Sequence, residues 1–117
     1  MTVQDLANEL GWKLLAGSSG AEKEVEGCFA GDLLSWVMSH GRPGQVWLTV
    51  QNSDTALAVA VQTKFSAMVL AGNVRPDEAA LRQAEQRGVP LYSCKENLYE
   101  AAAAVYEALT GLSAENH

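Results

Sequence analysis

Three short polar segments carry the side chains best suited to binding a ligand. They are residues 51–55, 72–75 and 93–95, and each follows a predicted strand and precedes a predicted helix. In an open parallel sheet, ligands bind at the carboxyl ends of the strands, where helix N-termini offer free backbone amides to an anion. Arg75 or Lys95 would add a positive charge. The candidate ligand-binding residues are Gln51, Asn52, Ser53, Thr55, Gly72, Asn73, Ser93 and Lys95.

Several of these residues also fit a purely structural role. Ser53 is suited to capping the helix that follows it, and Ser93 opens a Ser-Cys-Lys-Glu capping box for the last helix. Asn73 suits a left-handed turn, and Lys95 suits a solvated surface position. The sequence leaves the ligand-binding and structural interpretations open.

The two cysteines, Cys28 and Cys94, lie far apart and form no CxxC pair. Two reduced thiols are expected. Cys94 would occupy the first turn of the last helix beside Lys95, a position that lowers a thiol pKa. It is therefore predicted to be the more reactive cysteine, although no general base lies near it in sequence.

No set of residues has the spacing of a catalytic or metal site. His40 ends a predicted helix, and Asp32 at a helix start is explained by capping and the helix dipole. The glycine-bearing segments 17–20 and 41–44 both lack the GxxxxGK[ST] pattern of a P-loop, which argues against kinase activity. We predict no catalytic residues, no metal and no cofactor.

Length and charge narrow the classes of partner. The 117 residues suit a single domain over residues 1–117, and a net charge of −6 repels a polyphosphate backbone, so nucleic acid is not an expected partner. The chain has no apolar stretch long enough to cross a membrane and no signal peptide, so a cytoplasmic location is expected. Residues 112–117 are expected to form a flexible tail.

The hydrophobic pattern predicts an α/β fold with a mostly parallel sheet of about five strands. From Val46 onward, strands and helices alternate, which favours parallel strands joined by crossover helices. At least one earlier strand is a candidate for antiparallel pairing. Strands are predicted over residues 12–16, 25–29, 46–50, 67–71 and 89–92, with helices after Thr2, Asp32, Ser53 and Pro76 and over residues 95–109.

Two helices are more apolar than a monomer requires. From Ala56 to Val61 the helix is apolar nearly all the way round, so it must be covered on more than its sheet side. The last helix carries a second apolar stripe of Tyr99, Ala103 and Tyr106 beside its core stripe. Exposed patches of this kind mark interfaces, so we predict a homodimer through these faces.

A family resemblance rests on the closing Ala-rich helix and on the segments GDLLSWVM, VWLTVQ, AVAV and MVLAGNVRPDEAALRQAEQRGVPLYS. Through these features the chain resembles a DRTGG domain over about residues 12–109. The resemblance implies a three-layer α/β/α sandwich similar to the N-terminal domain of HPr kinase/phosphorylase. Family members occur attached to phosphotransacetylase or to CBS-containing pyrophosphatases, and also alone. The literal Asp-Arg-Thr-Gly-Gly string is absent, and the nearest glycine-bearing strand end runs from Leu70 to Asn73.

These features together predict a non-enzymatic regulatory, ligand-sensing or protein-interaction module. Its ligand would be a small anionic metabolite or nucleotide bound at the strand ends. One alternative is a small enzyme acting on a phosphorylated substrate, or on a thiol-reactive one through Cys94. Another is a structural adaptor of a larger enzyme complex.

Overall fold

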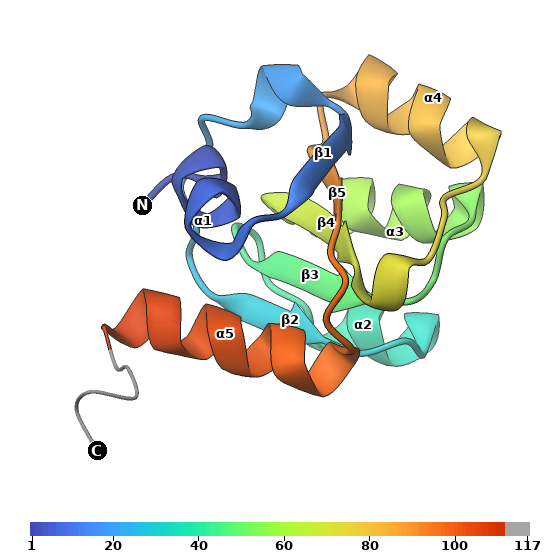
Figure 1. The fold of residues 1–117 in the computed structure, drawn as a ribbon. Helices are drawn as coiled ribbons and strands as arrows, with labels where there is room; N and C mark the ends of the chain where they lie inside the picture. Colours follow the sequence, from blue (N-terminus) through green and yellow to red (C-terminus); the bar gives the residue numbers. More distant parts are fainter. Residues whose placement is uncertain (112–117) are drawn as a thin grey trace.

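The apolar run Val46–Thr49 forms strand β3, and the run Ala67–Leu70 forms its neighbour β4, with every side chain of both strands buried. A strand that is buried on both faces needs a helix layer on each side of its sheet. The computed structural model of the chain, which describes residues 1–111, has this arrangement (Figure 1).

Three further strands complete the sheet: β1 (Lys13–Ala16), β2 (Cys28–Ala30) and β5 (Leu91–Ser93). The strand order is β1-β5-β4-β3-β2, and strands β2 to β5 all run parallel to one another. Strand β1 runs antiparallel to β5, with Lys13 opposite Ser93. The predicted five-stranded, mostly parallel sheet is confirmed, and the antiparallel strand is the first one.

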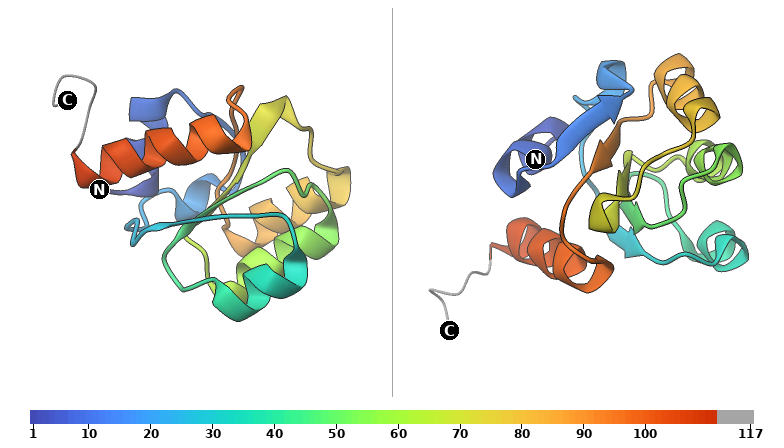
Figure 2. Two further views of the ribbon diagram at one scale, coloured as in Figure 1. Left: turned by 90° about the horizontal axis from the view of Figure 1, so that it is seen from below. Right: turned by 45° about the vertical axis from the view of Figure 1, so that its right-hand side comes forward.

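Helices cover both faces of the sheet. Helices α1 (Val3–Leu10) and α5 (Leu98–Thr110) lie on one face, and α2 (Leu34–His40), α3 (Asp54–Thr63) and α4 (Glu78–Arg87) lie on the other (Figure 2). Each face has its own hydrophobic core, because alternate residues of a strand point to opposite sides. The three-layer α/β/α sandwich is thus confirmed.

Strand β2 is shorter than the predicted strand over residues 25–29. The backbone amide of Val25 donates to the carbonyl of Met1 (3.0 Å) and that of Glu26 to the carbonyl of Gly44 (2.8 Å), so these residues leave the ladder with β3. The other predicted strands agree with the observed ones to within two residues at each end.

The predicted caps of two helices are present. Thr2 and Asp5 form a capping box at the start of α1, and the Ser53 hydroxyl accepts a hydrogen bond from the Ala56 amide (3.1 Å) at the start of α3. These contacts satisfy backbone amides that have no partner inside the helix.

The predicted start of the last helix is wrong. Ser93 belongs to β5, and α5 is capped instead by Asn97, whose side chain accepts from the Glu100 amide (2.8 Å) while Glu100 accepts from the Asn97 amide (3.1 Å). The segment before it stays extended because the Cys94 amide donates to the Leu70 carbonyl (3.0 Å). Lys95 therefore lies in a loop and not in a helix.

The apolar helix α3 is covered by its own chain. Ala56, Leu57, Val59 and Ala60 are buried, in a core shared with α2, α4 and the sheet. The prediction that the face from Ala56 to Val61 meets a partner is therefore wrong for these four residues, because α3 is the middle helix of its layer. In α5, by contrast, Tyr99 and Tyr106 are exposed.

Two expectations concern the ends of the chain and membranes. The tail predicted over residues 112–117 lies outside the described residues. Within the described part of the chain, no helix has the length and apolar character needed to span a membrane.

Replacing Asn97 by Ala should lower the free energy of unfolding by about 1 kcal/mol, because the first turn of α5 loses its cap. Ser93→Ala is the matched comparison, since Ser93 caps no helix, and it should change that free energy by less than about 0.5 kcal/mol. Urea unfolding followed by circular dichroism measures both. A larger loss for Ser93→Ala than for Asn97→Ala would contradict the observed helix start.

Candidate functional site

A groove of about 560 Å³ lies where β4 and β5 end and β1 begins. Lys13 and Ser93 meet here because β1 pairs antiparallel with β5. The loop after β4 forms the opposite side. The groove is lined by the polar residues Lys13, Asn73, Arg75 and Ser93 and by the apolar residues Leu15, Val74, Pro76 and Leu81.

The charge of this groove is opposite to that of the chain. Its two charged lining residues, Lys13 and Arg75, are both cationic, whereas the whole chain carries a net charge of −6. A local cluster of one sign raises the local concentration of ions of the other sign. The arrangement is therefore suited to an anion.

The loop after β4 is held by hydrogen bonds to the segment after β5. The Gly72 amide donates to the Glu96 carbonyl (2.7 Å), and the Asn73 amide donates to the Cys94 carbonyl (2.8 Å). Both Gly72 and Asn73 have left-handed backbones, with φ of 66° and 57°, as expected of Asn73. These two amides are consequently engaged within the fold and are not free to bind an anion, contrary to the sequence-based expectation.

Asn52 supports the groove from the neighbouring loop. The side-chain amide of Asn52 donates to the backbone carbonyl of Arg75 (2.7 Å), and the backbone carbonyl of Asn52 accepts from the Asp77 amide (3.0 Å). These bonds fix the backbone that carries the Arg75 side chain. Asn52 is thus placed to position a cation and is not itself a lining residue.

The other residues predicted at this edge have different positions. Gln51 donates through its side chain to the Asp32 carbonyl (2.8 Å), and Ser53 caps α3. Thr55 and Lys95 are exposed, and neither lines the groove. Of the eight candidates, the structure places Asn73 and Ser93 in the groove.

Asp32 has a role that the helix-capping interpretation missed. One of its carboxylate oxygens accepts hydrogen bonds from the Thr49 hydroxyl (2.7 Å) and the Val50 amide (2.8 Å). Helix α2 begins two residues later, with Leu33 at its N-cap position. Asp32 therefore joins the end of β2 to the end of β3 and does not cap α2.

The lowered thiol pKa expected of Cys94 is wrong. Cys94 is buried and precedes the helix by several residues, so burial, reinforced by the charge of Glu96, raises its thiol pKa. Burial also raises the pKa of Cys28 to about 12. Neither thiol has the lowered pKa that a nucleophile at neutral pH requires.

Lys13 is the charged groove residue that the sequence did not reveal as a candidate. It lies near the N-terminus in a predicted strand, and only the pairing of β1 with β5 brings it to Ser93. The pairing partner and direction of an isolated early strand leave no local pattern in the sequence. Arg75, by contrast, lies in the polar segment 72–75 that follows a predicted strand, and it was recognised as a possible source of charge.

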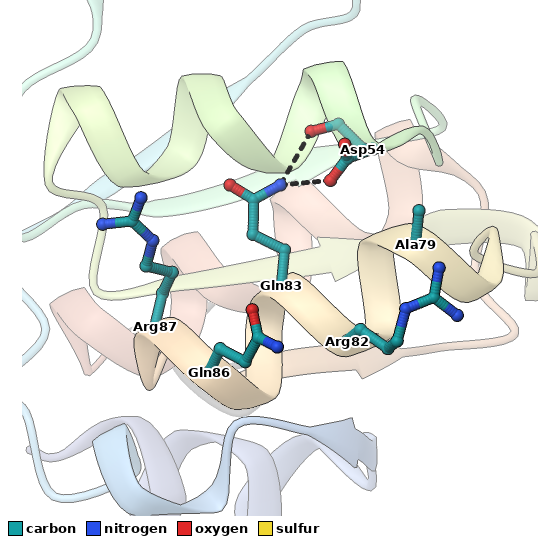
Figure 3. A pocket seen from close by; sticks show the side chains of 6 residues that line it. All are labelled: Asp54, Ala79, Arg82, Gln83, Gln86 and Arg87. Carbon is teal, nitrogen blue, oxygen red and sulfur yellow. Dashed lines mark hydrogen bonds between the residues drawn. The ribbon is translucent and has the colours of Figure 1, made fainter.

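A second hollow, of about 390 Å³, lies along the surface between α3 and α4 (Figure 3). The Gln83 side chain crosses it and donates to the backbone carbonyl and the carboxylate of Asp54. Arg82 pairs with Glu78 of its own helix at 3.9 Å. Two of the side chains that line this hollow bind each other, and one of them is an acid. The hollow is therefore a contact between two helices, and it is less suited to binding an anion than the groove is.

Metal binding receives no support from the described residues. Among residues 1–111, no group of three His, Cys, Asp or Glu side chains is placed to hold a metal ion.

Comparisons with known proteins place the chain in a family. The family model for the DRTGG domain matches residues 5–108. A solved structure of the CBS and DRTGG domains of the regulatory region of Clostridium perfringens pyrophosphatase, complexed with the activator diadenosine tetraphosphate, superimposes with a TM-score of 0.65 at 10% identity. The match covers 89% of this chain and 45% of that one. No curated protein gave a significant match.

Alkylation by iodoacetamide tests the state of the two thiols. At about pH 8, the raised pKa should make Cys28 react much more slowly in the folded chain than in urea, because its thiolate is scarce. Cys94 should also react more slowly when folded. The raised pKa of Cys28 also makes the stability of the folded chain depend on pH: its contribution is complete below 9.0, the ordinary pKa of the thiol, and is lost as the pH rises toward 12.

Mass spectrometry of the alkylated peptides separates the two sites, and the chain in urea is the control. Rapid labelling of Cys94 in the folded chain would contradict its burial.

Proposed function

This chain belongs to the DRTGG domain family, and we propose that it is a cytoplasmic regulatory module that senses a small anionic metabolite or nucleotide. The observation that carries the proposal is the groove at the ends of β4 and β5, whose two charged lining residues are both cations in an acidic chain. The structural relative is itself part of a regulatory region, and it was solved with a nucleotide activator.

The groove residues suit recognition of a phosphate. The guanidinium of Arg75 offers a planar set of donors that matches phosphate oxygens, while Lys13 supplies a point charge. Ser93 and Asn73 add uncharged polar groups beside them. Leu15 and the residues near Pro76 give the groove an apolar wall, against which a base or other ring would pack.

Ligand binding in this groove would connect parts of the fold that are distant in sequence. Lys13 lies on the antiparallel strand β1, whereas Arg75 lies on the loop after β4. An anion bound by both would hold β1 against the parallel part of the sheet. The Asn52 side chain, bonded to the Arg75 carbonyl, extends this connection to the loop after β3. A ligand that binds this arrangement of β1 more tightly than any other shifts the protein toward it, and a regulatory state is controlled in this way.

An enzymatic function has less support. The thiol-dependent version required a reactive Cys94, and burial raises the pKa of that thiol. The adaptor alternative differs from the sensor in one measurable respect, since an adaptor needs no small ligand.

The ligand proposal is tested by a thermal-shift screen of nucleotides and phosphorylated metabolites. A ligand held at 100 times its Kd adds about 2.7 kcal/mol to the stability of the native state, so a clear rise in Tm is expected for at least one compound. Arg75→Gln and Lys13→Gln should each weaken the affinity about tenfold or more, because each removes a charged hydrogen-bond donor.

Arg82→Gln is the matched control, since Arg82 is an exposed arginine outside the groove. It should leave the affinity unchanged. The sensor proposal fails if no compound raises Tm, which would favour the adaptor, or if Arg75→Gln and Lys13→Gln both bind a hit as tightly as the unmodified chain.

We also propose that the chain forms a homodimer through the exposed face of α5. Tyr99 is 82% exposed and Tyr106 is 61% exposed, and Ala103 lies between them on the same face. The opposite face of α5, with Ala101 and Val105, is buried in the core. Tyrosines beside a small residue suit an interface, because they bury a large area and permit close packing.

Sedimentation at tens of micromolar should therefore give the mass of a dimer. The double variant Tyr99→Arg and Tyr106→Arg should sediment as a monomer, because two charges would be buried in the interface. Met38→Arg, at an exposed apolar residue of α2, is the control and should remain dimeric. A monomer for the unmodified chain would refute the proposed interface.

A further inference from the structure

A pocket of about 280 Å³ lies at the opposite edge of the sheet, where the parallel strands begin. Gly44 precedes β3, Ser66 precedes β4 and Val89 precedes β5, and all three line it. The ends of α3 and α4 contribute Lys64 and Arg87. None of its lining residues belongs to the groove described above.

Ser66 carries a polar group that the fold leaves without a partner. The residue is 2% exposed, and its hydroxyl makes no hydrogen bond within the chain. Its neighbours Phe65 and Ala67 are buried apolar residues. A buried hydroxyl without a partner costs stability, and an alanine here would avoid that cost. The hydroxyl therefore calls for a partner from outside the chain.

Lys64 is a second costly residue at the same pocket. It ends α3 with a left-handed backbone, φ 61°, whereas α1, α4 and α5 end at glycines: Gly11, Gly88 and Gly111. Glycine adopts this conformation without strain, and a residue with a Cβ does not. Strained backbone that a glycine would relieve is characteristic of functional positions.

The charged residues around the pocket are mainly cations. Lys23, Lys64 and Arg87 line it, and the Lys23 ammonium is held by a hydrogen bond to the Gly88 carbonyl (3.2 Å). Figure 3 shows the Arg87 side chain extending from α4 toward α3, at the end of α3 away from Asp54. One acid, Glu24, also lines the pocket, and its carboxylate pairs with the N-terminal ammonium at 3.2 Å.

Helix dipoles alone do not account for this arrangement. A cation near the C-terminus of a helix is favourable, which explains Arg87 on α4 and the charge of Lys64. It also accounts for Lys23, whose ammonium binds the carbonyl of Gly88 at the C-cap of α4, but it does not explain the buried hydroxyl of Ser66. It also does not explain why the left-handed position at Lys64 lacks the usual glycine.

We propose that this pocket binds a small organic anion, a carboxylate or a phosphate monoester attached to a compact apolar group. The anionic group would lie among the cations and accept a hydrogen bond from the Ser66 hydroxyl. The apolar group would contact Phe65 and Val89, which form the apolar wall. The volume is near the lower limit for ligand pockets, which restricts the ligand to a small molecule.

The test is a titration of the full ¹⁵N-labelled chain with phenyl phosphate and with benzoate, followed by NMR. Saturable shifts of the Lys64, Ser66 and Val89 amides are expected with at least one of the two anions, and the pair of results identifies phosphate or carboxylate as the preferred group. Benzyl alcohol, which has the same ring without a charge, should give no saturable shifts. Absence of saturable shifts at these amides with both anions would overturn the proposal.

Two variants separate ligand binding from a structural role. Ser66→Ala and Lys64→Gly should each weaken the binding about tenfold. Both should also raise Tm, because they remove the unpartnered hydroxyl and the strained backbone, respectively. If either residue were kept for stability, its substitution would lower Tm instead. Unchanged affinity in both variants would overturn the proposal, whatever their stability.

Lys13→Gln distinguishes this pocket from the groove at the other edge of the sheet. It should leave the binding of phenyl phosphate or benzoate at Ser66 unchanged, while it weakens any ligand of the groove. A loss of binding at Ser66 in Lys13→Gln would show that the anions do not act at a separate site and would count against the proposal.

Discussion

The burial of β3 and β4 on both faces is the constraint on which the rest of this protein depends. Val46 and Leu48 point into the core shared with α1 and α5, while Trp47 points into the core shared with α2, α3 and α4. Even the polar group of Trp47 is satisfied, since its indole donates to the Gly31 carbonyl (2.9 Å). With both faces occupied, the sheet leaves its two ends for polar chemistry.

The sequence predicted the elements whose signals are local. Continuous apolar runs identified β3 and β4, and a serine before an apolar helix identified the cap of α3. The prediction of where α5 starts failed because residues 93–96 and the segment from Asn97 to Glu100 both fit a capping box. Hydrogen bonds from the loop after β4 decide between them, and these bonds connect residues that are distant in sequence.

The site was predictable only in part, for the same reason. Asn73 and Ser93 lie close to the ends of predicted strands, so the rule that ligands bind at strand ends identified them. Lys13 depends on which strand β1 pairs with and in which direction. The apolar character of α3 was recognised, but composition does not show whether the covering surface comes from the same chain or from a partner. Here α2 and α4 provide it.

The antiparallel pairing of β1 with β5 has a consequence for synthesis on the ribosome. Within residues 1–111, β1 pairs in the sheet with β5 alone, and α1 packs against α5, which lies far later in the sequence. The Trp12 ring packs against the Tyr92 ring in a tilted arrangement, with ring centroids 5.8 Å apart. The apolar side chains of α1 and β1 must therefore stay uncovered until β5 and α5, far later in the sequence, have emerged. A nascent chain arrested before β5 would present α1 and β1 to chaperones and proteases.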